Sequence, residues 1–281
     1  IPRSDEPINS SDIAQLREEV NQLKERLSNI KTPPVSSGKE VSYSVTKKIT
    51  MKEGTSQVGL DIDLRSKSMP EIFRERLIVF TRYPEPGTTK TRMIPELGKE
   101  GAAELQRQMT EHIISRAKAL CSKKFVPVEV RYEGGGERRM AQWLGPGLSY
   151  CRQGSGDIGL RMGRAFQDAF AQGCETAVII GSDIPDITTD LMKGAFAALE
   201  KNDLVLGPAS DGGYYLIGLH RRSFKHWYPH IFCDINWGNE RVLPQTLEIA
   251  DNLKLTYSLL PTLRDVDRPE DLIVWHHAAG K

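Results

Sequence analysis

Three positive charges gather in the stretch "TRYPEPGTTKTRM", which directly follows the apolar run "LIVF". Arg82, Lys90 and Arg92 supply the charge, and Gly87 allows a ligand to approach the backbone closely. Cations combined with free amide donors suit a diphosphate. The Lys90–Thr91 pair is shared with P-loops, but the glycines that a P-loop requires are missing. We interpret the stretch as an anion site, and the alternative is a solvated basic turn.

A carboxylate follows a second apolar run, "AVII", in the stretch "IIGSDIPDI". Asp183 leaves the end of this run, and Pro185 keeps the chain extended after it. A carboxylate emerging into a cleft is costly without a cation, so a divalent metal is its natural partner, with Asp186 in a supporting role. The alternative is a helix N-cap, but Thr188 or Thr189 is better placed to cap the following helix.

Further acidic residues lie in two other turns. Asp211, Gly212 and Gly213 form a tight turn in "GPASDGGYYLIGL", and we assign the turn a functional role because we expect it at the same edge of the sheet as the two stretches described above. A plain Asp-Gly hairpin turn would use the same residues. Near the end, "DVDRPEDL" places Asp265 and Asp267 before a helix that starts with proline, where each is either a second metal ligand or a cap.

The glycines of "GSGDIG" match the spacing of a dinucleotide-binding fingerprint. Gly154, Gly156 and Gly159 carry the match, but no acidic residue ends a strand about 20 positions later, as the fingerprint requires. Asp157 stands where a helix N-cap would be, and Arg161 lies one turn further on. We interpret the stretch as a cap over a nucleotide site, with Asp157 and Arg161 as substrate contacts, and not as a dinucleotide site.

Strand-like and helix-like segments alternate from residue 76 onward. The sequence predicts strands at 76–82, 126–132, 176–181, 203–208 and 213–219, and helices at 100–120, 158–170 and 188–200. This alternation predicts an α/β fold with a mostly parallel sheet and helices on both faces. Ligands bind such sheets beyond the carboxyl ends of the strands, so the loops described above are where chemistry is expected.

The first 75 residues have a different pattern. Apolar residues recur at spacings of three and four, at Ile13, Leu16, Val20, Leu23, Leu27 and Ile30. This heptad pattern predicts a coiled-coil helix over 1–31 and self-association of the chain through it. The alternative is an amphipathic helix lying on the main domain. Residues 32–75 are predicted to be a linker or a small hairpin, with short strands at 40–45 and 58–64.

Composition indicates an ordinary globular protein. The 281 residues include 38 basic and 37 acidic side chains, and 39% are hydrophobic, so no excess of positive charge points to nucleic acid. The longest apolar runs have the length of strands, which predicts no membrane span. Because the sequence begins at Ile1 rather than Met, we expect a fragment or a processed form, and we expect a cytoplasmic location.

Four cysteines are spread widely through the sequence, at Cys121, Cys151, Cys174 and Cys233. They contain no CxxC pair, and we expect them to be reduced packing residues rather than a disulfide or a zinc site.

Taken together, six stretches resemble one known family. "FTRYPEPGTTKTRM", "GSGDIGLRMGRAF", "IIGSDIPDI", "GPASDGGYYLIGL", "INWGNERV" and "LRDVDRPEDL" resemble, in order, the GT-A-type nucleotide-diphospho-sugar transferase-like family, whose members are associated with selenium and arsenosugar gene clusters. The resemblance covers 76–277 and implies a GT-A fold, in which a Rossmann-like half binds the nucleotide and a divalent cation bridges its diphosphate. The predicted boundary of this domain is 76–281.

The resemblance also implies roles for single residues. The basic loop with Arg82, Lys90 and Arg92 matches the nucleotide-phosphate loop of the family, and Asp183 matches the acidic position that holds Mg²⁺ or Mn²⁺. The turn of Asp211, Gly212 and Gly213 matches the acceptor side, where Tyr214 and Trp237 are further expected substrate contacts, and Asp183 and Asp211 are the expected catalytic residues. Asn239 stands where similar sequences have Thr after Trp-Gly, and this departure concerns the acceptor preference.

Three functions remain open on this reading. The first is a metal-dependent glycosyltransferase that moves a sugar from a nucleotide-sugar to a small-molecule acceptor. The second is a nucleotidyltransferase, because the Lys-Thr-Arg stretch also resembles that of phospholactate guanylyltransferase-like enzymes. The third is a nucleotide-binding module without catalysis, against which the retained carboxylates Asp183 and Asp211 argue.

Overall fold

The structure is a computed structural model that describes residues 46–52, 55–61, 74–124 and 126–279. Contacts divide the chain into two units between residues 65 and 66. In the first unit, β1 (Thr46–Lys52) and β2 (Thr55–Asp61) form an antiparallel hairpin. The strand predicted at 58–64 overlaps β2, whereas the strand predicted at 40–45 and the coiled coil predicted at 1–31 lie outside the described residues.

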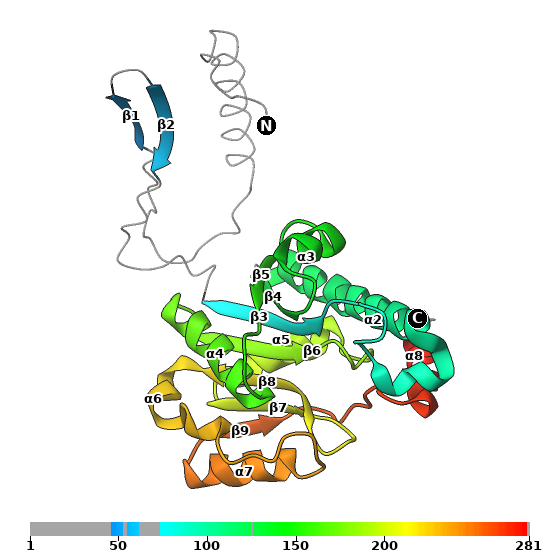
Figure 1. The fold of residues 1–281 in the computed structure, drawn as a ribbon. Coiled ribbons are helices and arrows are strands. Elements are labelled where there is room, and N and C mark those ends of the chain that lie inside the picture. Colours follow the sequence, from blue (N-terminus) through cyan, green and yellow to red (C-terminus); the bar gives the residue numbers. More distant parts are fainter. Residues whose placement is uncertain (1–45, 53–54, 62–73, 125, 280–281) are drawn as a thin grey trace. The chain divides into compact units, whose positions relative to one another are not determined.

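A seven-stranded sheet forms the centre of the second unit (Figure 1). Its strands are β3 (Glu75–Arg82), β4 (Val128–Glu133), β5 (Ser149–Arg152), β6 (Thr176–Gly181), β7 (Leu204–Pro208), β8 (Tyr214–His220) and β9 (Tyr257–Leu259). Their spatial order is β5-β4-β3-β6-β8-β7-β9. In this spatial order, the four strands β5, β4, β3 and β6 pair in parallel, and β7 pairs in parallel with β9.

One strand runs against the others. β8 pairs antiparallel with both β6 and β7. Its direction follows from its connection, because only residues 209–213 join β7 to β8, and so short a loop can join only antiparallel neighbours. The prediction of a mostly parallel α/β sheet is confirmed, and the one reversed strand is the difference.

Helices cover both faces of this sheet (Figure 1). They are α2 (Ile94–Lys124), α3 (Glu137–Leu144), α4 (Ile158–Ala171), α5 (Thr189–Leu199), α6 (Phe224–Trp227), α7 (Val242–Asn252) and α8 (Leu272–Ala279), with short 3₁₀ turns η2 (Thr91–Met93), η3 (Arg221–Ser223), η4 (His230–Phe232) and η5 (Pro269–Asp271). Side chains of α2, α3 and α5 join one apolar core, those of α4 and α7 join a second, and the first half of α2 packs with α8 in a third. Among the described residues, no helix combines the length and the apolar character that crossing a membrane would need.

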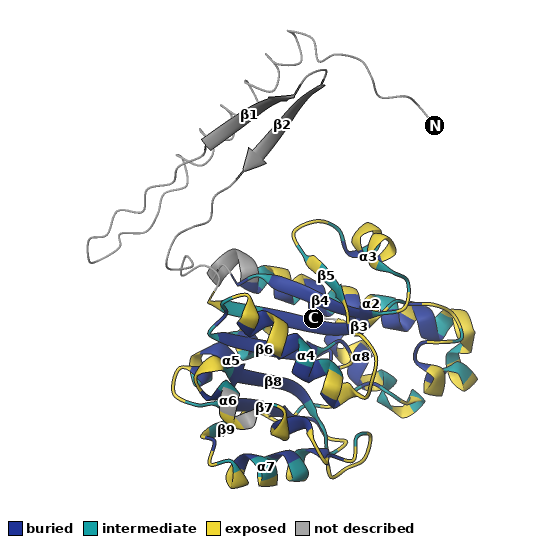
Figure 2. Cartoon of the chain, turned by 60° about the vertical axis from the view of Figure 1, so that its left-hand side comes forward, coloured by how far each residue is buried: buried dark blue, intermediate teal, exposed yellow. Residues whose placement is uncertain are grey.

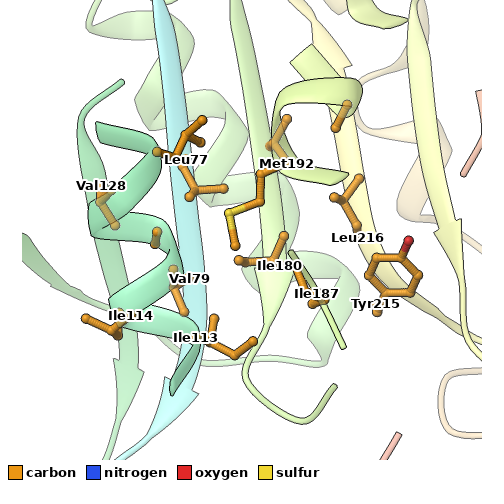
Figure 3. Packing of buried hydrophobic residues seen from close by; sticks show 14 of the residues in the cluster. Leu77, Val79, Ile113, Ile114, Val128, Ile180, Ile187, Met192, Tyr215 and Leu216 are labelled. Atoms are coloured by element: carbon orange, nitrogen blue, oxygen red, sulfur yellow. The ribbon is translucent and has the colours of Figure 1, made fainter. Parts of the chain in front are cut away.

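The central strands are buried on both faces, as near-continuous apolar sequences predict (Figure 2). In β3, Leu77 and Val79 pack toward α2, where they meet Ile113 and Ile114 (Figure 3). The alternate residues of β3, Ile78 and Phe80, belong to the core on the opposite face. Burial on both faces fixes the strands and therefore fixes the loops at their ends.

Several elements were not predicted from the sequence, among them α7, which has 11 residues. The helix predicted at 100–120 is the main part of α2, whose Gly98 has φ 70° and ψ 175° and interrupts the helix near its start. α3, β5 and β9 have eight, four and three residues, which is too short for periodicity to reveal them.

Candidate functional site

A pocket of about 580 Å³ opens where β3, β4 and β6 end. Its lining contains four cationic side chains and three carboxylates, namely Arg82, Lys90, Arg92, Arg161, Glu133, Asp183 and Asp267. The ends of these strands converge there because the strands are parallel neighbours. Ligand sites of α/β sheets are expected at this edge, beyond the carboxyl ends of the strands. The structure thus brings the basic loop, Asp183 and Arg161 into one cavity, and Thr91 lines it as well.

Lys90 connects the basic loop to the C-terminal part of the chain. Its backbone is left-handed, with φ 47°, and only 3% of its side chain is exposed. Its Nζ donates to the carbonyl oxygen of Val266 at 2.6 Å and lies 2.8 Å from Oδ1 of Asp183. A non-glycine residue in this conformation is uncommon and is typical of positions that the surrounding structure over-determines.

Asp183 leaves β6 as the sequence predicts, and its side chain is 54% exposed toward the pocket. The N-cap of α5 is Thr188, whose side chain accepts from the N–H of Leu191 at 3.1 Å, so Asp183 is not a cap. The sequence predicts a divalent metal as the natural partner of this carboxylate. The structure adds a second partner, because Lys90 supplies one positive charge next to it.

The segment 265–267 completes this side of the pocket. Arg92 forms an ion pair with Asp267, and the N–H of Val266 donates to the carbonyl oxygen of Asp183 at 2.9 Å. Asp271 fixes the segment from η5, because its Oδ2 accepts from the N–H of Asp267 at 3.2 Å. Of the two acidic residues that the sequence singled out here, Asp267 is the one that lines the pocket.

Glu133 lies on the opposite wall, at the end of β4. Its Oε2 accepts from Nη2 of Arg82 at 2.7 Å and from Nη1 of Arg161 at 3.0 Å. Burial raises the pKa of Glu133, but the hydrogen bonds and charges of both arginines outweigh burial and leave that pKa below its ordinary value. The carboxylate is therefore ionised near neutral pH.

A buried polar network forms the floor. Thr81, Gln106, Thr110 and Ser182 are all buried, and their side chains hydrogen-bond to one another at 2.8–3.3 Å. Gln153 supports the wall beside it, because its Nε2 donates to the carbonyl oxygens of Thr81 and Arg131. Buried polar groups that hydrogen-bond to one another in this way hold the strand ends in one arrangement.

Comparison with known proteins gives this pocket a context. Residues 116–239 match a family model described as "Uncharacterized protein conserved in bacteria (DUF2064)". A crystal structure of a protein from Desulfovibrio desulfuricans G20, provisionally described as a nucleotide-diphospho-sugar transferase, is 34% identical, with a TM-score of 0.65, and the match covers 72% of this chain and 86% of that one.

The chain belongs to the nucleotide-diphospho-sugar transferase-like family.

A more distant structure has the same fold. It is 4-diphosphocytidyl-2C-methyl-D-erythritol synthase from Anaerococcus prevotii DSM 20548, which is 12% identical with a TM-score of 0.51, and the match covers 76% of this chain and all of that one. No curated protein matches the sequence.

In the present chain, the turn after β7 lies outside the pocket lining. Oδ1 of Asp211 accepts from the N–H of Gly213 at 2.9 Å, which is the local geometry of an Asx turn. Gly212 has φ 89°, and a Cβ there would lie 2.2 Å from the carbonyl oxygen of Glu240, so glycine is required for close approach of the two loops. The N–H of Ser210 donates to the carbonyl oxygen of Leu263 at 2.9 Å, which places the turn beside the segment that leads to residues 265–267. Burial, and then the charge of Asp211, raises the pKa of Asp265.

Two predicted substrate contacts pack together near α4. The rings of Tyr214 and Trp237 meet edge to face, with centroids 6.4 Å apart. Trp237 lies against Gly159, where a Cβ would come within 2.5 Å of the indole. Neither aromatic side chain lines the pocket, and burial raises the pKa of Tyr214.

The glycine-rich stretch connects β5 to α4 and is held by arginine side chains. Asp157 caps α4, because its Oδ1 accepts from the N–H of Leu160 at 2.8 Å. Nε of Arg161 donates back to the carbonyl oxygen of Gly156 at 2.9 Å. The strand after α4 is β6, which pairs with β3 rather than with β5, so the glycines do not connect neighbouring parallel strands as a dinucleotide fingerprint does.

Gly87 lies in the basic loop but not in the lining of the pocket. It has φ 81°, and a Cβ there would meet the aliphatic stem of Lys99 at 3.5 Å. In this structure Gly87 therefore permits the turn that brings the cations of the basic loop together.

The carboxylates of the pocket fit a divalent cation only in part. Asp183 and Asp267 offer oxygen ligands, but no group of three or more His, Cys, Asp or Glu side chains that could hold a metal exists among the described residues. Mg²⁺ is usually held by one or two carboxylates together with substrate phosphates, rather than by an all-protein cage. The donor set therefore fits a cation that arrives with phosphate groups.

Five of the polar residues that line this pocket were not predicted from the sequence, namely Thr81, Gln106, Glu133, Gln153 and Ser182. Glu133 had a usable pattern, since it directly follows the predicted strand "VPVEVRY", much as Asp183 closely follows the predicted strand at 176–181. The two glutamines carry no such pattern, because helix and loop positions do not reveal from the sequence which side chains reach a site.

Proposed function

We propose that this chain is a metal-dependent glycosyltransferase that moves a sugar from a nucleotide-sugar donor to a small-molecule acceptor. The observation that carries the proposal is the pocket, in which four cationic side chains and the carboxylates of Asp183 and Asp267 meet at the carboxyl ends of parallel strands. Membership of the nucleotide-diphospho-sugar transferase-like family supports the same function.

The basic loop and α4 would hold the donor. Arg82, Arg92 and Arg161 line the pocket and can donate charged, bidentate hydrogen bonds to phosphate oxygens. Lys90 adds a positive charge behind Asp183, and Thr91 adds a hydroxyl at the start of η2. Because these groups are already in place, they would stabilise the negative charge that builds on the leaving nucleoside diphosphate.

Asp183, with Asp267 beside it in the lining, would hold Mg²⁺ or Mn²⁺. A bound cation would add Lewis-acid stabilisation of the diphosphate. The chain's own part is to present these carboxylates, and the contacts of Lys90 and Arg92 hold each of them in position.

The acceptor side is assigned to the turn after β7. Asp211 is the proposed second catalytic residue, and Gly212, Gly213, Tyr214 and Trp237 are proposed to contact the acceptor. The link between the two sides is the segment 263–267, which bridges to Ala209 at one end and hydrogen-bonds to Asp183 near the other. Asp157 would act on substrate through the position of α4, the helix that it caps.

A second function is nucleotidyl transfer, in which a nucleoside triphosphate reacts with a phosphorylated acceptor. Four cationic side chains in one pocket favour it, because that amount of positive charge also suits a triphosphate.

Product analysis tests both functions. The protein is incubated with a panel of nucleotide-sugars or nucleoside triphosphates, Mg²⁺ or Mn²⁺, and candidate acceptors, and the products are identified by ³¹P NMR. Release of nucleoside diphosphate from a nucleotide-sugar is the expected result, whereas release of pyrophosphate would establish nucleotidyl transfer. Binding across the panel without turnover would contradict both and support a non-catalytic module.

A further inference from the structure

Two arginines from distant parts of the chain meet on one oxygen atom in the pocket. Arg82 ends β3, Arg161 lies in the first turn of α4, and both donate to Oε2 of Glu133. Two like charges so close together repel each other unless an anion lies between them. Glu133 supplies that anion from the end of β4, and its side chain is 42% exposed to the pocket.

Each guanidinium is also anchored on its far side. Nη1 of Arg82 donates to the carbonyl oxygen of Thr88 in the basic loop at 3.2 Å. Nε of Arg161 donates to the carbonyl oxygen of Gly156, and its Nη1 donates to Oε1 of Gln153 at 3.3 Å. Glu133 is therefore the central link of a chain of contacts that runs from the basic loop to the glycine-rich loop.

These contacts leave donors available for a ligand. A guanidinium has five N–H groups, and the contacts described above occupy two of those on Arg82 and three of those on Arg161. Each arginine can therefore still bind one phosphate group, and the shared carboxylate fixes the distance between the two arginines.

We infer that Glu133 is a positioning residue that joins Arg82 and Arg161 into one site for two linked phosphate groups. The site would select a nucleoside diphosphate over a nucleoside monophosphate, because the second arginine is useful only to a ligand with a second phosphate. This inference rests on the proposed function, since it assumes that a nucleotide occupies the pocket.

The lowered pKa of Glu133 agrees with this role, because an ionised carboxylate holds two guanidinium groups at any pH near neutral. A carboxylate that only repelled phosphates would have the opposite effect on binding. Removing its charge would then strengthen the binding of every anion, and this difference makes the role measurable.

The test compares wild type with Glu133→Gln by calorimetric titration with a nucleoside diphosphate, the matching monophosphate and inorganic pyrophosphate. Glu133→Gln should weaken diphosphate and pyrophosphate binding about tenfold and leave monophosphate binding within about twofold. Arg82→Ala should remove most of this difference, so that adding Glu133→Gln to Arg82→Ala changes diphosphate affinity little. Glu175→Gln is the matched control, because it removes a carboxylate paired with an exposed arginine, Arg74.

The outcomes separate this inference from the proposed function. If wild type binds the diphosphate and Glu133→Gln leaves the ratio of the two affinities unchanged, or tightens both ligands, Glu133 is not a positioning residue although the nucleotide site stands. If wild type binds neither nucleotide nor pyrophosphate, both proposals are overturned. Melting curves of each variant exclude unfolding as the cause of weak binding.

Discussion

At the scale of single residues, the contact between Lys90 and Asp183 determines how charge is distributed in the pocket. The ammonium group of Lys90 is almost fully buried, while more than half of the Asp183 side chain is exposed. The buried charge of Lys90 therefore needs Asp183 as a partner more than the exposed charge of Asp183 needs Lys90, because a buried charge without a partner is costly.

Asp183→Asn should lower both activity and stability. The amide keeps the shape of the side chain but removes the charge opposite Nζ of Lys90, so the free energy of unfolding should fall by about 1–3 kcal/mol. Urea unfolding measures this loss, and Asp190→Asn, which removes an exposed pair with Lys193, is a control expected to change stability little. Turnover of Asp183→Asn near the wild-type rate would exclude Asp183 as the proposed catalytic residue.

Much of the pocket could be predicted at this scale, for a physical reason. Arg82 is the last residue of β3 and Asp183 lies two residues after β6, and parallel strands bring such residues to one edge of the sheet. The ion pairs could not be predicted, because Arg92 and Asp267 are 175 residues apart and only the folded chain brings them together. For the same reason, Asp183 was expected to need an external cation.

At the scale of elements, the short edge strand β9 is held by side chains beyond its own hydrogen bonds. Asp203, just before β7, accepts from the N–H and the hydroxyl group of Thr256, just before β9, at 3.0 and 2.7 Å. It also accepts from Nε of Arg222 at 2.9 Å. Burial would raise the pKa of Asp203, but these hydrogen bonds outweigh burial and lower it to about 2.

This pKa predicts a pH-dependent contribution to stability. Since the pKa is lowered in the folded state, the contribution is complete above the ordinary pKa of 3.8 and is lost as the pH falls toward 2. Asp203→Asn should therefore cost about 2 kcal/mol at pH 7, and the difference from wild type should shrink below pH 4. Urea unfolding at several pH values measures it, and a difference that does not depend on pH would contradict the assignment.

Several elements were predictable from their apolar patterns, although α7, which has 11 residues like α5, was not predicted. β3, β6, α4 and α5 have clear apolar patterns, and they agree with the sequence to within a residue or two. The antiparallel direction of β8 was contained only in the alternative of a plain Asp-Gly hairpin turn, since an apolar run does not show which neighbour it pairs with.

At the scale of the whole molecule, the second unit contains the sheet and the pocket described above, all within residues 66–281. The coiled coil predicted at 1–31 lies outside the described residues and remains a prediction, together with the oligomer that it would form. A heptad stripe serves partner helices rather than a globular core.

Deleting residues 1–31 should therefore reduce the oligomeric state and leave the second unit folded. Light scattering measures the mass of the full chain and of the shortened chain, and circular dichroism verifies that the helix and strand content of the second unit persists. Equal subunit numbers for the two chains would show that the heptad stripe does not drive association.

Calorimetric titration with a nucleoside diphosphate tests the central claim most directly, which is that this pocket binds the diphosphate of a nucleotide. Arg92 lines the pocket with 64% of its side chain exposed, so Arg92→Ala removes a charged donor with little effect on the fold. Losing a charged hydrogen bond costs about 1.5–3 kcal/mol, so the dissociation constant should rise roughly 10- to 150-fold. Arg74→Ala removes an arginine that pairs with Glu175 outside the pocket, and it should leave binding unchanged. Equal affinity of Arg92→Ala and wild type, or no binding by wild type at all, would contradict the claim.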